Sequence, residues 1–86
     1  MNDKYEITEE THPDSPRLRH IRALRDVCPG VRKGDMGGWV ESESNLATYG
    51  SAWVYGDAQV YGNAQVYGNA WVYGDARVSG DARVYG

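Results

Sequence analysis

The chain has few of the residues that usually build a large core or a crosslinked framework. It has no Phe, one Cys and two Met in 86 residues, and Leu, Ile and Val together number 14. That share, about 16%, is below the level of about 20% at which disorder is suspected. The formal net charge is only −3, however, so the high charge that normally accompanies disorder is absent. Length and composition predict one small domain with a thin core.

Other absences exclude whole classes of protein. A single cysteine, Cys28, excludes an internal disulfide framework and a multi-cysteine zinc site. No apolar run approaches the roughly 20 residues of a membrane span, and the polar residues 1–10 lack the apolar core of a signal peptide. A pI near 5.2 argues against a general nucleic-acid binder. We therefore expect an intracellular protein that has no membrane association and does not bind nucleic acid directly.

What the chain does contain is a repeat of six residues that runs without a gap from Gly50. Its units are GSAWVY, GDAQVY, GNAQVY, GNAWVY, GDARVS and GDARVY, which cover residues 50–85. Ala and Val alternate with the other two strand positions, so Ala and Val share one face and the variable residue and Tyr share the other. Gly followed by Asp, Asn or Ser supplies a corner. A helix is excluded by the period of six and by the regular glycines, each of which costs about 1 kcal/mol relative to Ala. The repeat predicts a solenoid of short parallel strands.

The repeat resembles the left-handed parallel β-helix of hexapeptide-repeat proteins. In that family an aliphatic residue and a small residue two positions before it point inward, as Val54 and Ala52 would here. The residue after the aliphatic one is usually small in that family but is Tyr in this chain. The resemblance implies an all-β fold in which three hexads, 18 residues, form one triangular coil.

Two degenerate hexads, 38–43 and 44–49, precede the regular ones. In these we expect Val40 and Leu46 at the Ala position, with Ser42 and Thr48 at the Val position. The eight hexads together give somewhat fewer than three coils.

Residues 1–37 carry no repeat and are predicted to cap the solenoid formed by residues 38–86, within one compact domain. Tyr5 and Ile7 share one side of a predicted strand, and residues 18–24 fit a strand or a short helix. Residues 11–16 between them are predicted to form a polar loop with two prolines. We favour a β-hairpin. A cap is needed because an open solenoid end exposes edge strands and core side chains to water.

The outward positions form columns when residues 18 apart stack. Trp53 then lies beside Trp71, and Tyr55 beside Tyr73, on one flat aromatic face. Contiguous aromatic surfaces usually mark interaction sites, and Trp and Tyr are common binding hot spots. We therefore predict that these four residues bind a partner. The alternative, in which tyrosine ladders only stabilise neighbouring coils, remains open.

The last hexad is as regular as the others, so the final coil presents unpaired strand edges. Self-association through Val84, Tyr85 and Tyr67 is predicted, either by end-to-end stacking of coils or by strand addition to a partner.

The turn residues Asp57 and Asp75 also form a column, but two carboxylates are too few ligands for a Ca²⁺ site. We interpret them as solvated turn residues.

The sequence argues against catalysis, a cofactor or a metal centre. Acyltransferases of the hexapeptide family use a His in or beside a loop that protrudes from a coil, and the carbonic anhydrases of that fold need three His. This chain has only His12 and His20, both before the repeat, and no phosphate-binding glycine loop.

A second resemblance covers nearly all of the chain beyond Arg17. The segments HIRAL (20–24) and VRKGDMGGWVESESNL (31–46), followed by the repeats of 52–86, are similar to small hexapeptide-repeat proteins encoded by phages and prophages. The resemblance implies an origin in mobile elements and a location in the cytoplasm of a bacterial host.

By analogy with other small phage proteins, we expect a non-enzymatic inhibitor of a host defence complex, of the anti-CRISPR type. It would bind a CRISPR effector or another defence complex through the aromatic face, or act by self-association. Two alternatives remain: a structural β-helical module that assembles without a soluble target, and a degenerate hexapeptide acyltransferase.

Overall fold

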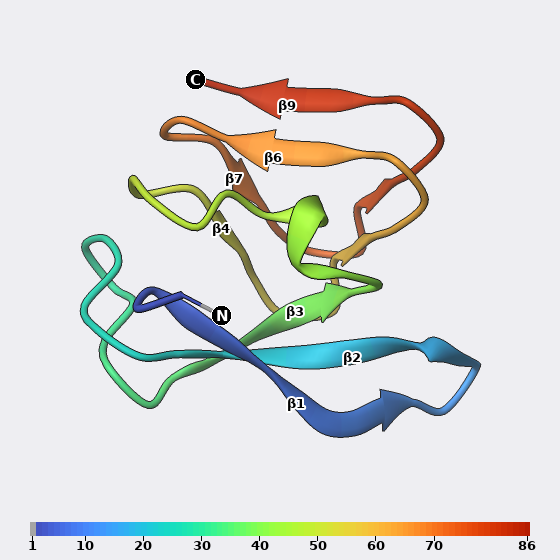
Figure 1. The fold of residues 1–86 in the computed structure, drawn as a ribbon, viewed down its shortest axis with the longest axis horizontal. Helices are drawn as coiled ribbons and strands as arrows, with labels where there is room; N and C mark the ends of the chain where they lie inside the picture. The colour runs from blue at the N-terminus through green and yellow to red at the C-terminus, as the bar shows by residue number, and fades with distance from the viewer. Residues whose placement is uncertain (1) are drawn as a thin grey trace.

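The computed structural model describes residues 2–86, so Met1 of the predicted capping segment lies outside it. Within this range the fold is all-β, as predicted, with one short 3₁₀ turn. Figure 1 shows the N-terminal strands at the bottom and the later strands stacked above them, with the C-terminal end at the top. The elements are β1 (Tyr5–His12), β2 (Ser15–Ala23), β3 (Met36–Val40), η1 (Glu43–Asn45), β4 (Trp53–Val54), β5 (Gln59–Val60), β6 (Gln65–Tyr67), β7 (Trp71–Val72), β8 (Arg77–Val78) and β9 (Arg83–Tyr85).

The repeats pair as parallel strands whose residues are 18 apart. Val54 pairs with Val72 in β4 and β7, and the same spacing joins β5 to β8 and β6 to β9. The spacing expected for three hexads in each coil is therefore observed. The corners also follow the prediction, because each repeat glycine from Gly50 to Gly80 has a positive φ, such as 58° at Gly56. A side chain at these positions would be strained.

The first coil has a different register from the one predicted. Val40 pairs with Val60, and Leu46 forms a bridge with Val66, so both occupy the Val position of the repeat. Their predicted place at the Ala position is wrong. Gly38, two residues before Val40, takes the Ala position instead. The residue there is a glycine because a Cβ would lie 2.5 Å from the carbonyl oxygen of Ala58.

The prediction that Ser42 and Thr48 take the inward Val positions is also wrong, because Val40 and Leu46 occupy those positions. Ser42 is only partly buried and Thr48 is exposed. Leu46 and Val54 are eight residues apart, whereas Val54 and Val60 are six apart. The two additional residues lie in the corner formed by residues 47–51, which we call the wide corner. The first coil is therefore longer than the later coils.

Lys4 is buried and holds the wide corner in place. Its Nζ donates hydrogen bonds to the carbonyl oxygens of Ala47, at 2.9 Å, and Tyr49, at 3.0 Å. The neighbouring Tyr5, also buried, donates from its hydroxyl to the carbonyl oxygen of Leu46 at 2.6 Å. The N-terminal strand thus supplies donors to backbone carbonyls that the irregular corner leaves without strand partners, and such buried carbonyls are costly when unpaired.

Asn45 gives the first coil a second set of polar links. Its Oδ1 accepts hydrogen bonds from the backbone N–H groups of Glu41 and Ser42, at 3.0 and 2.8 Å. Its Nδ2 donates to the carbonyl oxygen of Ala64 in the next coil, at 2.9 Å. The buried amide side chain thereby joins two coils at a point where regular strand pairing is interrupted.

The N-terminal segment forms the predicted hairpin and continues the sheet of one solenoid face. Strand β1 pairs antiparallel with β2, β2 pairs antiparallel with β3, and the sheet order is β1-β2-β3-β5-β8. Residues 18–24 therefore belong mainly to a strand rather than a helix. The polar loop predicted at 11–16 is reduced to a tight turn at Pro13 and Asp14.

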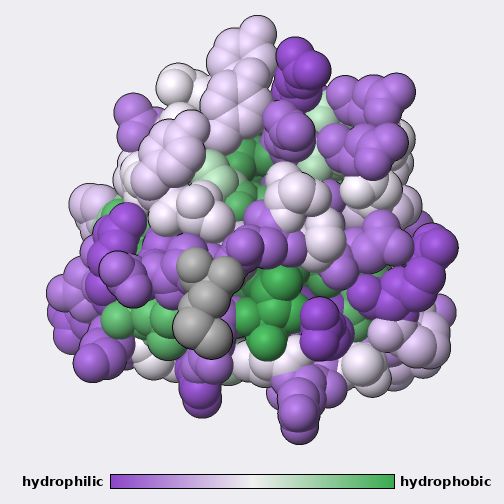
Figure 2. All heavy atoms as spheres, in the orientation of Figure 1, coloured by the Kyte–Doolittle hydropathy of each residue, from purple (hydrophilic) through white to green (hydrophobic). Residues whose placement is uncertain are grey.

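One continuous core runs from the hairpin into the coils. Tyr5, Ile21 and Ala23 belong to the same buried cluster as Val54 and Val60. On the face that Figure 2 shows, in the orientation of Figure 1, hydrophobic residues appear as limited areas among hydrophilic ones.

The protonation of Lys4 generates a pH-dependent prediction. Burial, reinforced by the nearby Arg25 guanidinium, lowers the pKa of Lys4 to about 8 from its ordinary 10.5. Between these values the unfolded chain binds a proton that the folded chain does not, so stability rises with pH. We expect the free energy of unfolding to increase by about 1–2 kcal/mol between pH 7.5 and 9.5 in urea titrations. Burial also raises the pKa of Tyr5, so stability should fall again above pH 10.

The Lys4→Met variant should lose the rise between pH 7.5 and 9.5, although its overall stability is lower. Lys33→Met is the matched control because Lys33 is exposed, and this variant should keep the rise. Equal slopes in wild type and Lys4→Met would contradict the assignment.

Candidate protein-binding surface

Trp53 does not lie on an exposed face. It pairs in register with Trp71, as expected, but only 1% of its surface is exposed. Its ring meets Tyr5 edge to face at 6.4 Å, and it shares the core cluster with Val27 and Val31 from the segment after β2. The prediction that Trp53 presents itself to a partner is therefore wrong, because the N-terminal segment buries the first coil at this position.

The other three predicted residues are brought together. Tyr55, Trp71 and Tyr73 line one shallow depression, which we call the aromatic surface. Trp71 is 50% exposed and Tyr73 is 69% exposed, while Tyr55 is partly buried. The rings of Tyr55 and Trp71 meet edge to face with centroids 6.2 Å apart. The depression is thus almost entirely aromatic in its lining.

The backbone under the aromatic surface is fixed by the solenoid. Trp71 lies between the buried residues Ala70 and Val72, whose carbonyl oxygens accept hydrogen bonds from the preceding coil at 3.1 and 2.7 Å. Trp71 therefore projects from a strand that is anchored on both sides in sequence. Aromatic side chains on such a rigid support lose little conformational entropy when they bind.

Tyr55 is tied to the N-terminal segment by its hydroxyl group. Its Oη lies 3.2 Å from the Sγ of Cys28, which itself sits in the turn closed by the bridge to Val31. Burial, together with this hydrogen bond, raises the pKa of Tyr55 further above the neutral pH range, in which a phenol is already uncharged. The aromatic surface accordingly carries no charge of its own and suits an apolar group.

The residues predicted for self-association lie around the last coil. Tyr67 and Tyr85 stack with centroids 5.2 Å apart and ring planes inclined by 17°. Val84 beside them is only partly buried. Strands β7, β8 and β9 are the outermost strands of their sheets, so within residues 2–86 no strand pairs with their outer edges.

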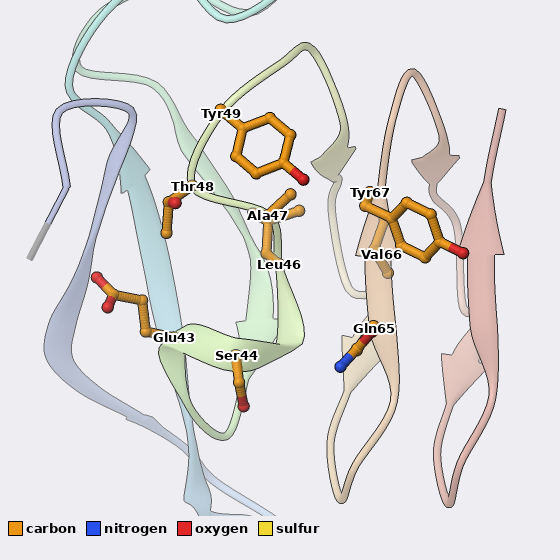
Figure 3. A pocket seen from close by; sticks show the side chains of 9 residues that line it. All are labelled: Glu43, Ser44, Leu46, Ala47, Thr48, Tyr49, Gln65, Val66 and Tyr67. Atoms are coloured by element: carbon orange, nitrogen blue, oxygen red, sulfur yellow. The ribbon is translucent and has the colours of Figure 1, made fainter.

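Tyr49 is a further exposed aromatic residue, which was not predicted to bind a partner. Tyr49 belongs to the wide corner, is 70% exposed and lines a groove together with Tyr67. Figure 3 shows its ring over the loop that carries Ala47, with Tyr67 on the neighbouring strand. The only available signal was the altered spacing around it, which the assumed hexad 44–49 concealed. The groove is lined by Glu43, Ser44, Leu46, Ala47, Thr48, Tyr49, Gln65, Val66 and Tyr67.

Both histidines have structural contacts. His20 lies over the Trp39 ring at 3.7 Å, and its Nδ1 is 2.9 Å from the carbonyl oxygen of Gly37. His12 accepts the backbone N–H of Asp14 at 3.0 Å within the hairpin turn. Across residues 2–86, no three His, Cys, Asp or Glu side chains are grouped so as to hold a metal ion. The same residues include no helix with the length and apolar character needed to span a membrane.

The comparison with known families agrees with the architecture. A family model described as the YdcK beta solenoid repeat matches residues 58–74 and 76–86, which carry β5 to β9. The matched residues are therefore similar to a β-solenoid repeat, in agreement with the parallel pairing of β4 to β9 at a spacing of 18 residues. No curated protein and no solved structure matches the chain.

The different exposures of the three tryptophans predict how iodide quenches fluorescence. Trp39 and Trp53 are 6% and 1% exposed, against 50% for Trp71. Iodide should therefore quench mainly the Trp71 emission, and Trp71→Gln should leave a blue-shifted spectrum with little quenching. Unfolding in guanidinium provides the control, because it should make the remaining tryptophans accessible. Unchanged iodide quenching in folded Trp71→Gln would show that another tryptophan is exposed.

Proposed function

We propose that the chain is a non-enzymatic protein-binding protein and that its aromatic surface makes the contact. The observation that carries this proposal is that the exposed residues Trp71 and Tyr73 and the partly buried Tyr55 surround a single depression. Exposed aromatic clusters on monomeric proteins are usually functional, and Trp and Tyr supply much of the binding energy at protein interfaces. Trp53, which pairs with Trp71 from the preceding coil, belongs to the buried core that supports this surface.

We further propose that the coils are the left-handed coils of a hexapeptide-repeat protein of phage or prophage origin, acting in the cytoplasm of a bacterial host. The 18-residue spacing of paired strands and the positive-φ corner glycines support the coil type. The resemblance of residues 20–24, 31–46 and 52–86 supports the origin. In this setting the partner is a protein of a host defence complex, such as a CRISPR effector, and binding inhibits that complex.

The repeat itself supplies substitutions that the fold accepts. Gln occupies the position of Trp71 in two other hexads, at Gln59 and Gln65, and Ser79 occupies the position of Tyr73. The variant Trp71→Gln/Tyr73→Ser therefore removes the aromatic surface with residues already used elsewhere in the solenoid. The matched control is Tyr61→Ser, which alters the same repeat position at a residue outside the aromatic surface.

The proposal is tested by selecting binders from a displayed library of bacterial protein fragments. Wild-type protein and the Tyr61→Ser control should enrich a common set of fragments. The Trp71→Gln/Tyr73→Ser variant should bind those fragments at least tenfold more weakly, roughly the loss expected when a hot-spot residue is removed. If the double variant enriches the same fragments with equal affinity, the aromatic surface is not the binding site.

A second candidate function, structural assembly, is favoured by the last coil. Ala76 and Ala82 are exposed there, although their repeat equivalents Ala58 and Ala64 are fully buried. Another solenoid end placed on this coil would cover these residues and pair the outer edges of β7, β8 and β9.

Sedimentation velocity distinguishes assembly from binding by a monomer. If the last coil assembles, wild-type protein at about 50 μM should sediment as a dimer or larger species, because the exposed strand edges can pair. Ala82→Lys should sediment as a monomer, whereas Arg83→Gln, which uses the residue found at Gln65 in the same column, should still assemble. A monomeric wild type would exclude the assembly.

A further inference from the structure

The aromatic surface adjoins a pocket that is rich in unpaired carboxylates. Three aspartates line this pocket, two from equivalent corners of consecutive coils and one from the turn of the hairpin. Within residues 2–86 none of the three forms an ion pair, and all three are exposed. The lining residues are His12, Asp14, Asp57, Gln59, Asp75 and Arg77.

The two features meet along one corner of the solenoid. In both coils a tyrosine of the aromatic surface is followed by a corner glycine and then by an aspartate of the pocket, as in Tyr73, Gly74 and Asp75. Two Cα–Cα steps of about 3.8 Å place each aspartate within about 7.6 Å of its tyrosine along the backbone. A short segment of a partner that covers the aromatic rings therefore reaches the carboxylates around the corner.

The charges that line the pocket are mainly negative. Residues 38–86 carry five acidic side chains and two basic ones, and Arg77 is the one cation in the lining of the pocket. An apolar depression flanked by negative charge is complementary to an apolar group flanked by positive charge. An acidic partner would meet like charges at the same place and would be rejected.

We propose that the partner of the aromatic surface is a basic protein segment, in which an aromatic or aliphatic anchor is followed within two or three residues by Lys or Arg. This inference rests on the proposed binding function and specifies its ligand. The anchor lies on Tyr55, Trp71 and Tyr73, and the cationic side chain turns the corner toward Asp57 and Asp75. The carboxylates do not form a site by themselves; they select the charge of the segment that the aromatic rings bind.

The repeat again supplies matched variants. Asn stands at the position of Asp57 and Asp75 in two hexads, at Asn63 and Asn69, so Asp57→Asn/Asp75→Asn removes the charges with residues that the corners already accept. Asp81→Asn is the control, because Asp81 occupies the same repeat position but lies outside the pocket.

The experiment sequences the fragments enriched from the displayed bacterial library and measures their affinities by fluorescence anisotropy. Fragments that depend on Trp71 should contain an aromatic or aliphatic residue with an excess of Lys and Arg beside it. Asp57→Asn/Asp75→Asn should bind them about tenfold more weakly at 50 mM salt, and the difference should shrink at 500 mM salt because salt screens exposed charges. Asp81→Asn should bind like wild type.

The outcomes separate this inference from the proposed function. Fragments that depend on Trp71 but show no basic excess, or that bind Asp57→Asn/Asp75→Asn as tightly as wild type, would overturn the inference and leave the binding function standing. If no enriched fragment depends on Trp71, the binding function fails and the inference fails with it.

Discussion

The stacking of valines in consecutive coils is the constraint on which the rest of the structure depends. Val40, Val60 and Val78 follow one another at equivalent positions on one face. On the other two faces Val54 pairs with Val72, and Val66 pairs with Val84. Because the side chains of a strand alternate, the placement of the inward valine also decides which neighbours point outward. The positions of the aromatic surface and of the column of corner aspartates thus both follow from the inward position of Val in each coil.

The repeat was sufficient to predict this regular part of the fold. Its alternation and corner glycines predicted short parallel strands, and the resemblance to hexapeptide-repeat proteins implied a coil of 18 residues. Trp53 and Trp71 are paired as this coil length requires. The degenerate first coil was harder, because Ser and Thr are small enough to imitate inward residues. The pairing of Val40 with Val60 and the close contact of Gly38 with Ala58, neither of which a sequence displays, show that the register shifts there.

The candidate site was predictable to the extent that it depends on the repeat alone. Tyr55, Trp71 and Tyr73 lie together because the solenoid places them in adjacent columns. The burial of Trp53 depends instead on Tyr5 and on Val27, which are distant in sequence and carry no pattern that links them to the solenoid. Contacts between a repeat and a segment outside it have no periodic signal, so exposure in the first coil could not be derived from periodicity.

The wide corner also shows how the solenoid tolerates irregularity. Two added residues between Leu46 and Val54 leave the later coils in phase, because the additional backbone bulges outward at a corner while the strands on either side keep their partners. An insertion of one residue within a strand would instead exchange inward and outward side chains. Corners are therefore the positions at which a chain of this kind can change in length, and acquire new surface features such as the exposed ring of Tyr49, without altering its core.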